Sequence, residues 1–172
     1  DTSQVTDMSF MFSFCEKMKN IDLSNFNTAK VINMTSIFSN SNNLESLDLS
    51  SFNTGEVEDT RAMFQNCRNL KNIKFGKFTT KYVKNMRLMF SFCSSITSLD
   101  LSSFMTENVQ SMKEMFYGCE KLDYLDLSSF KTPNVEDMED MFTSCKELKS
   151  LNLINFDTSK VTQMSRMFSS CG

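Results

Sequence analysis

The sequence predicts an α/β solenoid, a coil of stacked units that each contribute a short strand and a short helix. Valines recur every 26 residues without a slip, at Val5, Val31, Val57, Val83, Val109, Val135 and Val161. Two phenylalanine series keep the same period, from Phe12 to Phe168 and from Phe26 to Phe156. A fixed period between about 20 and 50 residues indicates a repeat array, whose neighbouring units bury one another's apolar faces.

Residues 122–147 show what one unit is expected to form. Residues 122–127 carry leucines at 122, 125 and 127, and the end of this segment alternates apolar and polar residues, which is the spacing of a strand. Thr132 and Pro133 then suit the N-cap and first position of a helix. The apolar residues that follow have the spacing of one helix face: Val135, Met138, Met141, Phe142 and Cys145. Each unit therefore predicts a strand, a turn and a helix.

The whole chain, residues 1–172, is expected to be a single solenoid of about six and a half units. A strand followed by a crossover and a parallel strand predicts a right-handed coil, with a parallel β-sheet on the concave face and short helices on the convex face. The strands are expected to begin near Met18, Leu44, Leu70, Ile96, Leu122 and Leu148. The chain starts and stops within a unit, so we expect a fragment of a longer array whose uncapped ends allow end-to-end self-association.

Composition argues against several classes of function. The net charge is −3, which predicts no general attraction to nucleic acid or anionic membrane, and no apolar run is long enough to enter a bilayer. The chain has no histidine, no glycine-rich phosphate loop and no nucleophile spaced with a base. We therefore expect no enzyme activity, no catalytic residues, no cofactor and no metal site.

The string LxxLDLSSFxTxxVxxMxxMFxxC, as written in residues 122–145, resembles the repeat of the BspA-like leucine-rich-repeat surface proteins, and in particular the 26-residue type found in mycoplasma lipoproteins. The resemblance covers the whole chain and implies a leucine-rich-repeat solenoid, secreted or displayed at the cell surface. It also implies adhesion through protein–protein interaction, or binding to a glycan, of a host or neighbouring cell. The alternative is a structural spacer or display scaffold with no ligand of its own.

This chain departs from the repeat at a few positions: Ser41, Thr60, Lys74, Phe75 and Asn152. Thr60 stands where other units have methionine, and Phe75 stands where they have leucine. We expect the Phe75 ring to fill the space left by Thr60.

Six cysteines share one column, a column being a set of residues 26 apart: Cys15, Cys67, Cys93, Cys119, Cys145 and Cys171. Two interpretations stay open, disulfide bonds between units or a ladder of buried free thiols acting as small apolar residues. Ser41 in the same column favours buried thiols. The methionines, mostly in two columns, are interpreted as core rather than as ligands of a soft metal ion.

The exposed positions of the strands form the predicted ligand-binding surface. Its candidate residues are Asp48, Lys74, Asp100, Tyr124, Asp126 and Asn152. The first interpretation is a concave recognition surface for a protein or glycan, strongest near Tyr124 and Ile154, where larger side chains interrupt small polar ones. The second is that these polar residues solvate the sheet and hydrogen-bond the turns.

Charges also follow the 26-residue period. A stretch of eight basic residues without acids, between Thr60 and Leu99, suggests either a polyanion site or pairing with acids in adjacent units. We favour pairing, because opposite charges recur one period apart and would fix the register of similar units. The predicted pairs are Glu45–Lys71, Asp48–Lys74, Glu58–Lys84, Lys81–Glu107, Glu120–Lys146 and Asp140–Arg166.

Overall fold

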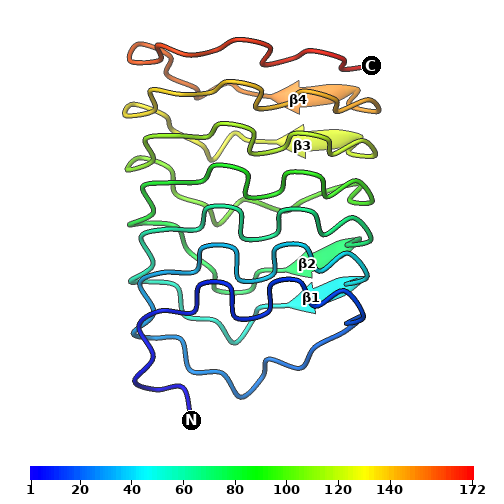
Figure 1. The fold of residues 1–172 in the computed structure, drawn as a ribbon. Coiled ribbons are helices and arrows are strands. Elements are labelled where there is room, and N and C mark those ends of the chain that lie inside the picture. Colours follow the sequence, from blue (N-terminus) through cyan, green and yellow to red (C-terminus); the bar gives the residue numbers. More distant parts are fainter.

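Figure 1 shows the protein, in a computed structural model that describes residues 1–172, as a chain that coils through a stack of similar layers. The two termini lie at opposite ends of the stack. Parallel bridges join equivalent residues of successive layers in one unbroken series: Asp7, Asn33, Asp59, Asn85, Ser111, Asp137 and Gln163. The 26-residue period of the sequence is therefore a neighbour relation in space.

Four strands of three residues each form two parallel pairs. These strands are β1 (Ser46–Asp48), β2 (Asn72–Lys74), β3 (Tyr124–Asp126) and β4 (Ser150–Asn152). β1 pairs with β2 and β3 pairs with β4, always between residues 26 apart. The middle residue of each strand points inward and is the most apolar one, as the two-residue alternation of a strand requires.

The expected single sheet of six strands is wrong, because the layers beginning near Met18 and Ile96 contain no strand. A strand of three residues depends on very few hydrogen bonds, so a small change in layer spacing removes it. The interruption between β2 and β3 lies beside Phe75, which replaces a leucine at the end of β2. Its ring reaches into the next layer, where its centroid lies 5.1 Å from that of Phe104.

The expected helices on the convex face are also wrong, because the structure contains no helix. In residues 138–145 alternate N–H groups donate to the next layer, such as Met138 to the carbonyl of Gln163 (2.8 Å) and Phe142 to that of Met167 (2.9 Å). The N–H groups between them close tight turns within the layer, as Cys145 does to the carbonyl of Phe142 (3.1 Å). We call this segment, and its equivalents in the other layers, the turn wall.

Left-handed backbone is what allows these turns to replace a helix. Two residues per layer of the turn wall have positive φ, for example Asp140 (56°) and Ser144 (63°). A type II turn requires such a residue at its third position. Most of these residues carry side chains, and Gly118 is the one glycine among them. The strain of each, about 1 kcal/mol, is offset by hydrogen bonds to the adjacent layer.

Thr132, predicted as a helix N-cap, instead joins layers, as do other threonines of its column. The Thr132 hydroxyl donates to the carbonyl of Asp157 and accepts from the N–H of the same residue, both at 2.8 Å. Thr28, Thr54, Thr80 and Thr106 make the same pair of bonds with the residue 25 positions later. A single hydroxyl thus satisfies both the N–H and the carbonyl of one residue, which explains the invariance of threonine in this column.

Phenylalanine columns fill the space between the strands and the turn wall. From Phe12 to Phe168, successive rings of the first column stack with centroids 5.4–5.9 Å apart. Phe75 lies beside this column, with its ring centroid 6.3 Å from those of Phe64 and Phe90. The expected contact between Phe75 and Thr60 stays a prediction. Buried valines, methionines and leucines complete one continuous core.

We predict that Phe75→Leu lowers the free energy of unfolding by about 1–2 kcal/mol, since a smaller side chain leaves a cavity among aromatic rings. Phe10→Leu is the matched control, because Phe10 is 59% exposed and should cost little. Leu101→Phe should gain less stability than Phe75→Leu loses, because Leu101 already lies in a filled position. Urea denaturation of the variants measures these differences, and equally small effects of Phe75→Leu and Leu101→Phe would contradict the prediction.

Candidate functional site

The predicted ligand-binding residues lie along the strand face, the outward surface of β1–β4 and of the layers between them. Parallel pairing brings Asp48 beside Lys74, and Asp126 beside Asn152. Asp100 lies in one of the two layers without a strand, the one near Ile96, and shares with Lys74 the wall of a hollow of about 370 Å³. All the predicted residues are exposed except Asn152, which is half-buried.

The acidic side chains of this face cap the turns that follow the strands. Asp48, Asp100 and Asp126 each accept the backbone N–H two residues later, at 2.9–3.1 Å, and Asn152 accepts that of Ile154 at 3.2 Å. The hydroxyl and N–H of Ser50, together with Lys74, lower the pKa of Asp48 to about 2. Serine donors likewise lower the pKa of Asp100 and Asp126. These carboxylates therefore have a structural use already.

Close backbone approach also shapes this face at Gly76. Its φ is +60°, and a Cβ atom there would lie 2.6 Å from Cα of Ser50 in the preceding layer. Only glycine fits this turn, because both the backbone angle and the contact exclude a side chain. Gly76 thus fixes the hollow that Lys74 and Asp100 line.

Two apolar side chains interrupt the polar strand face. Tyr124, the first residue of β3, is 51% exposed, and Ile154, which follows β4, is 78% exposed. Neither side chain has a hydrogen-bond or aromatic partner within the protein, whereas the neighbouring Asp126 is held by Ser128. They are the groups of this face best suited to contact a partner.

Charged residues pair between adjacent layers, as the column spacing predicted. Five of the six predicted pairs form: Glu45–Lys71 (3.5 Å), Asp48–Lys74 (3.1 Å), Glu58–Lys84 (2.6 Å), Glu120–Lys146 (2.9 Å) and Asp140–Arg166 (2.7 Å). The pair Lys81–Glu107 is wrong, because Glu107 contacts Lys131 (3.5 Å) and the Lys81 ammonium lies 4.9 Å from the centre of the Tyr82 ring. Most of these pairs are solvent-exposed, so each contributes about 0–1 kcal/mol.

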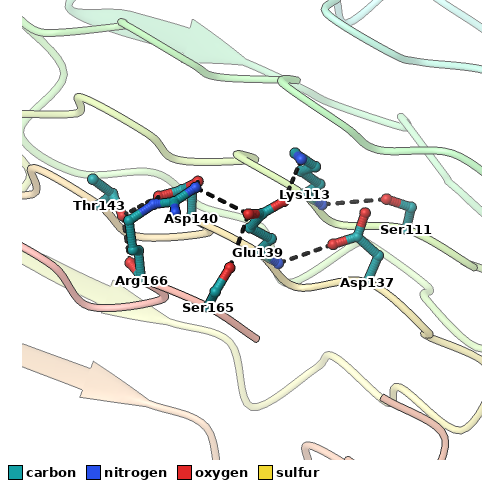
Figure 2. Close-up of polar contacts among 8 residues, drawn as sticks. All are labelled: Ser111, Lys113, Asp137, Glu139, Asp140, Thr143, Ser165 and Arg166. Atoms are coloured by element: carbon teal, nitrogen blue, oxygen red, sulfur yellow. Dashed lines mark hydrogen bonds and ion pairs between the residues drawn. The ribbon is translucent and has the colours of Figure 1, made fainter. Parts of the chain in front are cut away.

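The most buried carboxylate among the ion pairs is that of Asp140 in the turn wall (Figure 2), whose side chain is 9% exposed. Arg166 of the next layer binds its two carboxylate oxygens through Nε (3.0 Å) and Nη2 (2.7 Å). The Thr143 hydroxyl also donates to Asp140, at 3.0 Å. The Arg166 guanidinium holds the pKa of Asp140 below its ordinary value. This two-pronged geometry fixes both side chains, in contrast to the single contacts of the exposed lysines.

Glu139 extends the network to a third layer (Figure 2). Its carboxylate accepts hydrogen bonds from Ser165 (2.8 Å) and Arg166 (2.9 Å) of the layer that follows, and pairs with Lys113 of the layer before. Hydrogen bonds from Lys113 and Ser165 lower the pKa of Glu139. The network therefore joins three consecutive layers on the outside of the turn wall.

The cysteine column consists of free thiols. From Cys67 to Cys171, each Sγ donates to the carbonyl of the phenylalanine 29 residues earlier, at 3.1–3.2 Å. The Ser41 hydroxyl makes the same bond to the carbonyl of Phe12 at 2.8 Å, which explains why serine substitutes in this column. Burial raises the pKa of Cys67 and Cys145 to about 12, and it also raises that of Cys93 and Cys119 well above the ordinary value of a thiol. Buried, protonated thiols are poor nucleophiles and poor metal ligands.

The structure also contains a groove that the sequence did not reveal. It has a volume of about 550 Å³, and its lining residues come directly before or after the column valines from Val57 to Val161. We call it the valine-edge groove. In the sequence, the one sign of this groove is that the two residues flanking each column valine must lie on the same face. Because the types of these residues vary from layer to layer, that sign does not predict a groove. No three His, Cys, Asp or Glu side chains converge as a metal site would need.

Comparison with known proteins places the chain in a family. The sequence model of a family described as "Mycoplasma protein of unknown function, DUF285" matches residues 1–99 and again residues 89–172. No curated protein matches the chain. No helix here has the length and apolarity needed to cross a membrane.

The thiols predict a loss of stability at alkaline pH. Thiols of the unfolded chain ionise near pH 8.5. Folding raises the pKa of Cys67 and Cys145 to about 12. Their contribution to the free energy of unfolding is therefore complete below the pKa of the unfolded thiol, and it is lost as pH rises through the pKa of the folded thiol. Cys67→Ser, which copies Ser41, should make the fall of unfolding free energy between these values shallower. Chemical denaturation at several pH values measures it, and an unchanged slope would count against the prediction.

The Arg166 contact predicts a loss of stability at acid pH. Folding lowers the pKa of Asp140 and Glu139. Their contribution to the free energy of unfolding is therefore present above the pKa that they have in the unfolded chain, and it is lost as pH falls through the pKa of the folded state. Arg166→Met should therefore lower the melting temperature at pH 7 and make its acid-side decline shallower. Lys149→Met is the matched control, because Lys149 makes one exposed contact with Asp123 (3.2 Å). Equal losses from both variants would show that the enclosed network has no special role.

Proposed function

Since the chain belongs to the DUF285 family, whose description names no activity, we propose its function from its surface: it is a non-catalytic binding and adhesion module displayed at the cell surface. The partner is a protein or glycan of a host or neighbouring cell, bound through the strand face. The proposal includes a BspA-like architecture, a right-handed leucine-rich-repeat solenoid. Support for that architecture comes from the stacked layers and from the inward leucines of β1 and β3.

The observation that carries the proposal is the exposure of Tyr124 and Ile154. The other predicted residues of the strand face have partners within the protein, as Lys74 has Asp48 and as Asp100 has Ser102. The exposed side chains of Tyr124 and Ile154 have no such partner. Aromatic residues are enriched at protein interfaces. The rigid, hydrogen-bonded turns around them would limit the entropy lost on binding.

The second candidate function is a structural spacer that displays other domains and has no ligand of its own. It is favoured by the turn-capping role of Asp48, Asp100 and Asp126, because this role accounts for these residues without any ligand. The two candidates differ in one expectation. A binding module requires its exposed apolar side chains, whereas a spacer tolerates their loss.

We predict that the immobilised protein retains host cells or extracellular matrix proteins, and that Tyr124→Ala or Ile154→Ala weakens this binding about tenfold, as for residues at the centre of an interface. Ile32→Ala is the matched control, because Ile32 is 47% exposed but lies away from the strand face. Surface plasmon resonance measures the affinities. Unchanged binding by the triple variant Asp100→Ala, Tyr124→Ala, Asp126→Ala would remove the strand face from the account, and absence of any binding would favour the spacer.

A further inference from the structure

The valine-edge groove has a floor of regularly spaced peptides. Lys84 donates its N–H to the carbonyl of Glu58, Gln110 donates to that of Lys84, and Glu136 donates to that of Gln110, each at 2.9 Å. Residues of one column thus follow one another through direct backbone bonds, at the spacing of about 4.8 Å that separates paired strands. The groove therefore presents the same backbone geometry four times in a row, with different side chains.

Several polar groups of the groove have no partner within the protein. The side chains of Gln110 and Glu136 are exposed and make no hydrogen bond. Asn108 donates its Nδ2 to the carbonyl of Lys81 at 2.8 Å, which orients its side chain and leaves Oδ1 free to accept. An amide, a carboxylate and an oriented amide oxygen therefore lie in adjacent layers, ready to bind hydroxyl groups.

The charges of the groove cancel. Glu58 pairs with Lys84 at 2.6 Å. Lys160 donates to the neutral amide oxygen Oδ1 of Asn134 at 2.6 Å, so neither Lys160 nor Glu136 has an ion-pair partner within the protein. A polyanion such as nucleic acid would need a surplus of cations, which this groove does not have.

Tyr82 is the single hydrophobic residue in the lining of the groove. It is 42% exposed, and the Lys81 ammonium lies 4.9 Å from the centre of its ring. A peptide partner with apolar anchors would find no apolar pocket here, because the other seven lining residues are polar or charged. One exposed aromatic ring beside planar amides and a carboxylate instead suits a sugar, whose ring has an apolar face and hydroxyl edges.

We propose that the valine-edge groove binds an extended, uncharged oligosaccharide, with its hydroxyl groups bound by Asn108, Gln110 and Glu136 and one sugar ring against Tyr82. The layer spacing is similar to the length that one sugar ring adds to an extended chain, so successive rings meet successive layers. This site is separate from the strand face, and the proposal does not depend on the binding function proposed for that face.

The test uses a panel of linear tetrasaccharides as probes, titrated into the protein by isothermal calorimetry. The uncharged members are chitotetraose, cellotetraose, maltotetraose and mannotetraose, and a heparin-derived tetrasaccharide is the anionic member. We expect at least one uncharged probe to bind and the heparin probe not to bind. Failure of every uncharged probe, or tighter binding of the heparin probe, would overturn the proposal.

Variants then locate the binding. The double variant Gln110→Ala, Glu136→Ala should weaken the affinity about tenfold or more, because it removes two side chains that hydrogen-bond the probe. Gln163→Ala is the matched control, an exposed glutamine outside the groove that should leave affinity unchanged. Tyr124→Ala should also leave it unchanged, which separates this site from the strand face. Equal affinity of the double variant and the unmodified protein, with melting temperatures alike, would overturn the assignment.

Discussion

Peptide hydrogen bonds between successive layers are the constraint on which the rest of this structure depends. In the turn wall an N–H group bonds the carbonyl 25 residues later, so one added or deleted residue in a repeat would displace every donor from its acceptor. Each bond contributes about 1 kcal/mol net, but an unmade bond in a buried wall costs more than that. This accounting explains why the valines keep a spacing of 26 residues without exception.

Side chains reinforce the same register in ways that depend on chemistry rather than size. A threonine hydroxyl bonds both backbone groups of one residue in the next layer, as Thr132 does with Asp157. A thiol, or the hydroxyl of Ser41, reaches back to a phenylalanine carbonyl in the preceding layer. Ion pairs between residues 26 apart add a further condition on the same register. Small repeats without helices thus obtain a unique alignment from many weak, identical contacts.

The sequence was sufficient to predict the layer register, the core columns and five ion pairs, and to favour free thiols over disulfides in the cysteine column, since all follow from residues one period apart. It was not sufficient to distinguish helix from turn. Two consecutive tight turns place Met138, Met141 and Cys145 inward just as a helix would, and the left-handed positions hold residues such as Leu88 and Arg166 rather than glycine. The absence of a strand near Met18 and Ile96 leaves no periodic signal in the sequence, and neither does the valine-edge groove, whose exposed residues differ between layers.

The resulting surface combines internally bonded polar groups with a few that are not. On the strand face the carboxylates cap turns while Tyr124 and Ile154 remain exposed, and beside the valines Gln110 and Glu136 remain unpaired. Both binding functions that we propose act through such groups, and their positions depend on the ladder between layers. Scalar couplings across hydrogen bonds, measured by NMR, test that ladder most directly. The structure predicts a coupling from the amide nitrogen of Phe64 to the carbonyl carbon of Met89, whereas a coupling to the carbonyl of Thr60 would indicate a helix and contradict the account.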